Sequence, residues 1–172
     1  AMGDAGLLLH CSAISLHQAE GVEGRVAFYD ARLDPHRPEH LSLMSDLREA
    51  LERNDKAEIQ LFFQPKLDLK RGRLSGAEGL VRWHHAKRGF VPPDGFIGLA
   101  EDTGNIQRLT RWALASGIAQ AAAWRAQGRA LRMSINLSVR DLVDAELPRR
   151  VASLLETHRV PAEFLVLEVT ES

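Results

Sequence analysis

The stretch Gly76-Ala77-Glu78-Gly79-Leu80-Val81-Arg82-Trp83 decides how the fold of this chain is interpreted. In an extended strand the side chains alternate between two faces, so Glu78, Leu80 and Arg82 share one face and the neighbouring small and apolar residues take the other. A carboxylate and a guanidinium four residues apart on one strand face allow two interpretations. They form an ordinary exposed ion pair on an edge strand, or they belong to a polar site on the sheet.

The segments on either side of this stretch predict a mixed α/β chain. We predict strands over residues 25–30, 58–64, 76–83, 131–137 and 164–169, and helices over residues 5–20, 38–54, 94–104, 105–127 and 147–155. Pro65 is expected to end the strand over 58–64, because proline has no N–H for a ladder, and residues 66–69 are expected to continue as an extended segment. The loop from Lys70 to Arg73 predicts an antiparallel hairpin. The later alternation of strand and helix predicts a parallel sheet with helices outside it.

Composition is typical of a soluble globular protein. Of the 172 residues, 45% are hydrophobic and 26% are charged, and the net charge of −1 implies no global attraction to DNA or to an anionic membrane. The single cysteine, Cys11, cannot form an internal disulfide and suits a reducing cytosol. No apolar run approaches the roughly 18 residues of a membrane-spanning helix. We therefore expect a cytoplasmic location and no membrane segment in this chain, while a parent protein could carry a membrane or sensor domain outside it.

Five short motifs occur in order along the chain. They are Phe63-Gln64-Pro65, Glu78-Gly79-Leu80-Val81-Arg82-Trp83, the block from Gly89 to Gly104, Ser134-Ile135-Asn136-Leu137-Ser138, and Glu168-Val169-Thr170-Glu171-Ser172. Together they resemble the motifs of the EAL domains, phosphodiesterases that hydrolyse the bacterial second messenger cyclic di-GMP. The second motif resembles the family's Glu-Ala-Leu-x-Arg-Trp signature, and the resemblance runs from about Leu47 to Ser172.

The resemblance implies an α/β fold, an incomplete TIM-type (β/α) barrel that is about the first half of an EAL domain. Residues 5–20 and 25–30 loosely resemble the last helix and strand of a GGDEF (diguanylate cyclase) domain, without its catalytic residues. We accordingly divide the chain into 1–30, the tail of a GGDEF-like domain, 31–46, a linker and connecting helix, and 47–172, the N-terminal half of an EAL domain. We expect the chain to be a fragment of an EAL protein or a truncated relative.

The resemblance also implies a site. Three oxygen-bearing side chains lie near the ends of three predicted strands, where β/α barrels place their active sites: Glu78, Asn136 and Glu168. By resemblance these three bind Mg²⁺ or Mn²⁺, ions that prefer oxygen ligands, and Glu171 joins them as a catalytic residue by steadying a nearby loop. Three further residues are implied to contact cyclic di-GMP: Gln64, Leu80 and Arg82. The guanidinium of Arg82 matches phosphate oxygens in geometry.

Several of these residues also have a plain structural interpretation. Asn136 could cap the helix after Ser138, Glu168 could be an ordinary strand-end carboxylate, and Glu171 could be solvated. Between residues 66 and 88 there are seven basic residues and two acidic ones, an excess that would attract a dianion or form a solvated surface loop. We assign no role to His84-His85, because successive strand residues point to opposite faces.

The chain departs from the family pattern in three ways. Gly79 replaces the alanine of the signature, on the face opposite Glu78, and is expected to loosen helix–sheet packing without removing a ligand. Phe63 replaces a tyrosine. The family's Asp-Asp pair, a lysine, a further glutamate and a late glutamine have no counterpart among these residues.

Two functions follow from these observations. The first is that of a cyclic di-GMP phosphodiesterase, which opens one phosphodiester in a metal-dependent reaction to give pGpG, with the second half of its catalytic site absent from this chain. The alternative is a catalytically inactive receptor for cyclic di-GMP or a protein-interaction module. A homodimer through the open barrel edge is a further expectation, because unpaired strand edges invite another chain.

Overall fold

The structure is a computed structural model that describes residues 5–19, 26–30, 38–53 and 57–170. The chain divides into two compact units, residues 1–42 and 43–172. In the first unit, α1 (Ala5–Ala19) agrees with the predicted helix and exposes Leu8, Leu9 and Leu16. The strand predicted over 25–30 is wrong over 26–30, which have no regular structure. A strand needs a partner for its backbone N–H and C=O groups, and no described strand pairs with this segment.

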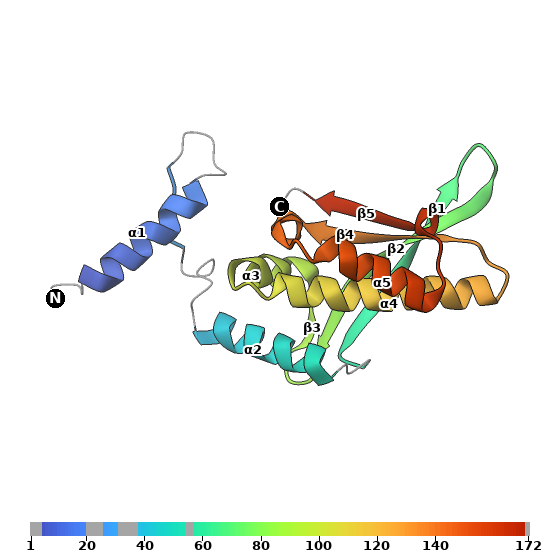
Figure 1. Ribbon diagram of the computed structural model, residues 1–172. Helices are drawn as coiled ribbons and strands as arrows, with labels where there is room; N and C mark the ends of the chain where they lie inside the picture. The colour runs from blue at the N-terminus through green and yellow to red at the C-terminus, as the bar shows by residue number, and fades with distance from the viewer. Residues whose placement is uncertain (1–4, 20–25, 31–37, 54–56, 171–172) are drawn as a thin grey trace. The chain divides into compact units, whose positions relative to one another are not determined.

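The second unit contains one mixed sheet (Figure 1). Its strands are β1 (Ile59–Asp68), β2 (Arg73–His85), β3 (Gly89–Val91), β4 (Arg132–Ser138) and β5 (Leu165–Thr170). The order is β1-β2-β4-β5, and the short β3 pairs only with the C-terminal end of β2. The β1–β2 and β2–β3 pairs are antiparallel, whereas β2–β4 and β4–β5 are parallel. The predicted hairpin and the predicted parallel sheet are both confirmed.

Helices α4 and α5 lie side by side along one face of this sheet (Figure 1). The helices are α2 (Pro38–Arg53), α3 (Ile97–Asp102), α4 (Ile106–Ala126) and α5 (Leu147–His158), with 3₁₀ turns at Pro93–Gly95, Val139–Val143 and Ala162–Phe164. The long α4 packs directly on β4. We call the face that these helices cover the outer face of the sheet, and the opposite face the inner face.

The core lies on the outer face and follows the predicted alternation. In β4 the buried residues Met133, Ile135 and Leu137 pack against Leu114 and Ile118 of α4. A second buried cluster joins α2 to the C-terminal end of β2 through Leu47, Trp83 and Phe96. Burying large side chains of this kind stabilises a fold by about 1.5–3 kcal/mol each. This packing fixes the outer face and leaves the alternate residues to the inner face.

His85 ties α2 to the end of β2. Its Nδ1 accepts hydrogen bonds from the backbone N–H groups of Lys87 at 3.0 Å and Arg88 at 3.3 Å. The proton is therefore assigned to Nε2, which donates to Asp46 Oδ2 at 2.9 Å. The structure thus gives this buried histidine a structural role.

Pro65 does not end β1, as its missing N–H had suggested. It lies within the strand opposite Ala77, one residue before a register shift at Lys66/Leu67. β1 is an edge strand of the described sheet, with β2 as its only neighbour. A proline is tolerated on an edge strand, because its missing N–H costs no ladder bond when it faces away from the partner. The strand therefore continues to Asp68 and carries Lys66 onto the inner face.

Gly79 and Gly117 make room for one methyl group, Cδ1 of Ile135. A Cβ atom added at Gly79 would lie 2.8 Å from this methyl group and 3.1 Å from Leu61 Cδ2, and one added at Gly117 would lie 2.6 Å from the same methyl group. The expectation that Gly79 loosens the packing is therefore wrong, because Ile135 fills the space that an alanine methyl would take. The expectation that residue 79 faces away from Glu78 is confirmed.

Gly79→Ala and Ile135→Val are expected to be coupled. Ile135→Val alone should lower the free energy of unfolding by about 1 kcal/mol. Gly79→Ala should cost less in the Ile135→Val background than in the wild type, because valine lacks the methyl group that the new Cβ would meet. Urea unfolding of the four proteins measures this coupling. Gly98→Ala is the control, since a Cβ there meets nothing within 4 Å. Additive effects of the first two changes would contradict the packing.

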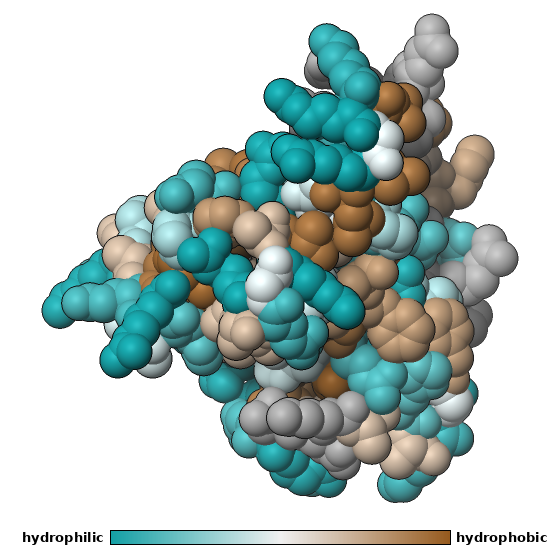
Figure 2. All heavy atoms as spheres, turned by 90° about the vertical axis from the view of Figure 1, so that its right-hand side faces the viewer, coloured by the Kyte–Doolittle hydropathy of each residue, from teal (hydrophilic) through white to brown (hydrophobic). Residues whose placement is uncertain are grey.

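A polypeptide of these 172 residues alone is expected to associate. In the described sheet β5 pairs only with β4, and it exposes Leu167 and Val169. Figure 2 looks onto the end that carries the β1–β2 hairpin, where brown apolar side chains are exposed among teal ones. Exposed apolar edge strands invite pairing with another chain. Light scattering should show dimers or larger species, and the pair Leu167→Lys and Val169→Lys should reduce them. A monodisperse wild-type monomer would contradict this expectation.

Candidate metal and nucleotide site

The strand register gathers the predicted site residues on the inner face. Gln64 lies opposite Glu78 across the β1–β2 pair, and Leu80 and Arg82 follow on the same face of β2. Ser134 of β4 is the partner of Glu78, and Asn136 is the partner of Glu168 across the β4–β5 pair. Because paired residues share a face, the polar side chains of four strands converge there.

Glu78 and Asn136 are joined by a hydrogen bond. The Asn136 Nδ2 group donates to Glu78 Oε1 at 2.9 Å, and the Glu78 side chain is 25% exposed. The turn after β4 is capped instead by Ser138 and Asp141: the Ser138 hydroxyl accepts from the Arg140 N–H, and the buried Asp141 carboxylate accepts from the Ser138 N–H at 2.9 Å. Asn136 is therefore not needed as a helix cap and faces the carboxylate.

Lys66 completes this cluster, and we did not identify it from the sequence. Its ammonium group donates to Glu168 Oε1 and to Ser134 Oγ, the latter at 2.9 Å, and lies 3.8 Å from Glu78 Oε2. The hydrogen bond from Lys66 is the main reason why the pKa of Glu168 is held below its ordinary value, and the Ser134 hydroxyl adds to the effect. Period-two alternation from Gln64 could have placed Lys66 on this face. Its contact with Glu168 could not be predicted from the sequence, because β5 is separated from β1 by two other strands of the sheet.

The donor set suits a hard divalent cation. Glu78, Asn136 and Glu168 offer carboxylate and amide oxygens, which Mg²⁺ and Mn²⁺ prefer. The ammonium group of Lys66 lies between the carboxylates of Glu78 and Glu168, so the space between these carboxylates favours a positive charge. Within the described ranges no group of three or more His, Cys, Asp or Glu side chains is arranged to hold a metal. In kind, the oxygen donors of Glu78, Asn136 and Glu168 fit a divalent ion. Glu171 lies outside the described residues.

The three residues implied to bind nucleotide share the inner face without meeting in one pocket. Leu80, Arg82 and Asn136 line a cavity of about 150 Å³ near the carboxyl end of β4. Arg82 donates to the Val81 carbonyl at 2.9 Å, and its guanidinium carbon lies 6.0 Å from the centre of the Phe62 ring. Gln64 is exposed and does not line this cavity. Arg82 has several N–H donors that these contacts do not use.

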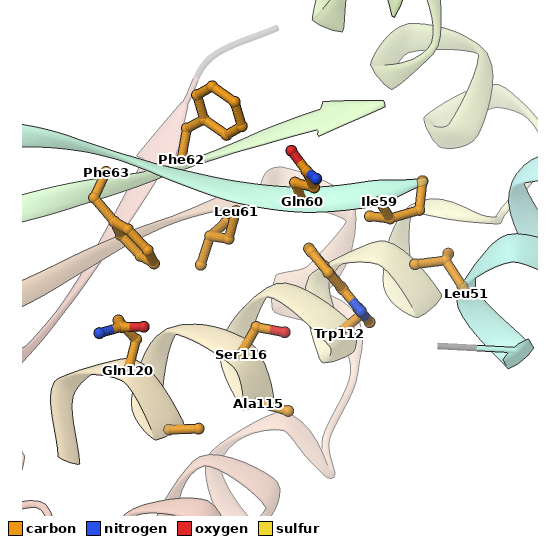
Figure 3. Close-up of a pocket in the computed structure, with 11 residues that line it drawn as sticks. Leu51, Ile59, Gln60, Leu61, Phe62, Phe63, Trp112, Ala115, Ser116 and Gln120 are labelled. Carbon is orange, nitrogen blue, oxygen red and sulfur yellow. The ribbon is translucent and has the colours of Figure 1, made fainter. Parts of the chain in front are cut away.

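A larger groove than this cavity lies elsewhere, between the edge strand β1 and α4 (Figure 3). Leu61 and Phe63 point from β1 toward Trp112, Ser116 and Gln120 of α4, while Phe62 points the other way. The groove therefore opens mainly on the outer face, away from the carboxylate cluster. No ionisable side chain is among the residues that line it.

Comparisons with known proteins found a matching family model and similar sequences. The family model described as "EAL domain" matches residues 44–172. The chain is 36% identical over 146 residues to a cyclic di-GMP phosphodiesterase of Pseudomonas aeruginosa, covering 85% of this chain and 24% of that protein. It is 33% identical over 167 residues to the bifunctional diguanylate cyclase/cyclic di-GMP phosphodiesterase MucR of the same organism, covering 96% of this chain and 24% of that protein. The chain thus spans about a quarter of the length of these relatives.

A solved structure is similar in fold. The MucR phosphodiesterase in complex with c-di-GMP superposes with a TM-score of 0.69 at 37% identity, over 76% of this chain and 52% of that one. No helix in the part of the chain that the structure describes is long and apolar enough to cross a membrane. The match to the family model covers most of the chain. The chain therefore belongs to the EAL domain family.

Proposed function

We propose that the protein containing this chain hydrolyses cyclic di-GMP to pGpG with the help of Mg²⁺ or Mn²⁺. The observation that carries the proposal is the convergence of Glu78, Asn136 and Glu168 from three adjacent strands on one face of the sheet. Relatives named as cyclic di-GMP phosphodiesterases support the reaction, and a similar structure in complex with c-di-GMP supports the ligand.

Each residue has a role that follows from its chemistry. Glu78, Asn136 and Glu168 would supply oxygen ligands, and the Asn136 amide group would hold the Glu78 carboxylate in position. Divalent ions at such sites lower the pKa of a bound water and stabilise the leaving oxygen. Arg82 would bind a phosphate through its free N–H donors, Gln64 would hydrogen-bond a guanine edge or a ribose-phosphate oxygen, and Leu80 would pack against the nucleotide.

We infer that the described sheet belongs to a larger (β/α) barrel, whose other strands would supply the missing ligands, and that Glu171 would steady a loop beside the metal. Residues 1–30 would be the tail of a GGDEF-like domain, and residues 31–46 its connection to the barrel. The two edge strands β1 and β5 support the barrel, because only closure removes sheet edges.

One observation favours a second candidate function. Lys66 pairs with Glu168 and lies beside Glu78, so the two carboxylates already have a cation. A receptor that binds cyclic di-GMP without cleaving it would need no metal at this position. Incubating the complete protein with cyclic di-GMP and Mn²⁺ separates the two functions, because only the phosphodiesterase yields pGpG. Binding without any product would favour the receptor.

Arg82→Ala in the complete protein is expected to weaken cyclic di-GMP binding by more than about tenfold, or about 1.4 kcal/mol. The change removes a guanidinium from the inner face beside Leu80, where the phosphate is proposed to lie. Calorimetry in a metal chelator measures the affinity without turnover. Arg88→Ala is the matched control, since Arg88 is an exposed arginine of the β2–β3 turn. Equal affinities of the wild type and Arg82→Ala would show that Arg82 lies outside the nucleotide site.

The 172-residue chain expressed alone is expected to show no measurable hydrolysis of cyclic di-GMP with Mg²⁺ or Mn²⁺. It holds three proposed metal ligands, and it lacks the aspartate pair and the lysine that the family resemblance assigns to the reaction. Chromatography of the nucleotide products measures turnover, with the complete protein as the positive control. Product formation by the isolated chain that disappears in Glu78→Ala would mean that the described residues suffice.

A further inference from the structure

Lys66 is a cation among the proposed metal ligands and has no assigned role in the proposed hydrolysis. Its ammonium group contacts Glu168 and Ser134 and lies 3.8 Å from Glu78. No other basic side chain among the described residues forms an ion pair with either carboxylate. Lys66 therefore supplies the nearest positive charge to both proposed metal-binding carboxylates.

The reach of Lys66 depends on the shape of the sheet. β1 and β5 are three strand spacings apart, which is about 14 Å in a flat sheet, and side chains stand roughly perpendicular to a sheet. The ion pair between Lys66 and Glu168 therefore requires the inner face to be concave. Gly76, the partner of Lys66 across the β1–β2 pair, places no side chain between them. An added Cβ there would lie 2.5 Å from the Arg132 carbonyl oxygen, so the register keeps this space free.

We propose that Lys66 is a built-in counter-cation that occupies the carboxylate cluster in the metal-free protein and competes with the divalent ion for Glu78 and Glu168. This inference rests on the metal site proposed above. Two carboxylates on one partly buried face repel each other unless a positive charge lies between them. The ammonium supplies that charge without a metal, and an ion that binds the same oxygens must displace it or tolerate its repulsion.

The geometry provides a place for the displaced ammonium. Ser134 accepts a hydrogen bond from Lys66 at 2.9 Å and is not itself a proposed metal ligand. The Lys66 side chain is 37% exposed, so water can also solvate it. Lys66 can therefore leave the carboxylates without losing all its partners. The expected consequence is a metal affinity below that of the same ligands without the lysine, so that the site fills only at higher metal concentration.

Metal binding to the complete protein without nucleotide tests this proposal. Mn²⁺ is titrated by calorimetry into the wild type, Lys66→Met, Lys66→Arg and Lys70→Met. Lys66→Met keeps an unbranched side chain and removes the charge, whereas Lys66→Arg keeps the charge. Lys70→Met removes the same charge from the exposed β1–β2 turn and controls for net charge. Glu78→Gln in a further titration establishes that Mn²⁺ binds at this cluster.

Lys66→Met is expected to bind Mn²⁺ at least about fivefold more tightly than the wild type, the size expected for removing a unit charge about 4 Å from the ion in a water-accessible site. Lys66→Arg and Lys70→Met should stay within about twofold of the wild type. Wild-type binding that Lys66→Met leaves unchanged or weakens would overturn the competition while leaving the metal site intact. Equal tightening by Lys66→Met and Lys66→Arg would also overturn it, because charge would not be the cause. A wild type that binds no Mn²⁺, or binding that Glu78→Gln does not weaken, would overturn the proposed metal site and this inference with it.

Discussion

The two faces of β2 cannot be exchanged, and the rest of the structure depends on this constraint. A shift of one residue in register would move Glu78 and Arg82 under the helices and expose Val81 and Trp83. Burying an unpaired carboxylate and a guanidinium in an apolar core would cost several kcal/mol. The core between the sheet and α4 thus determines which side chains face the inner side, and the inner side then receives polar residues from four strands.

Much of this could be predicted from the sequence, because the signals are local. Alternation in residues 131–137 placed Asn136 opposite the core, and the turn residues between β1 and β2 predicted their antiparallel pairing. The extra strand β3 was missed, since three residues are too few to show a period. Pro65 misled the prediction because its cost depends on whether β1 is an edge strand, and that is a property of the whole sheet.

The contacts of the site could not be predicted in the same way. The sequence placed Glu78, Asn136 and Glu168 near strand ends, but it left open whether Asn136 served as a cap, a question answered only by Ser138 and Asp141 taking that role. The position of Lys66 among the carboxylates results from the curvature of the sheet, which no short window of sequence contains. Glu171, outside the described residues, remains a prediction.

The Cδ1 methyl group of Ile135 lies between Gly79 and Gly117. This packing matters when members of the family are classified as active or degenerate from the residues of their signature motif. Position 79 contacts Leu61 and Ile135 and lies on the face of β2 opposite the carboxylate cluster. Glycine stands here in place of the alanine of the family signature because the Ile135 side chain fills the space that an alanine methyl group would take. The glycine leaves the side chains of the carboxylate cluster unchanged, because it lies on the other face of β2. Classifying a relative as degenerate from this letter alone would mistake a difference in steric complementarity for a loss of chemistry.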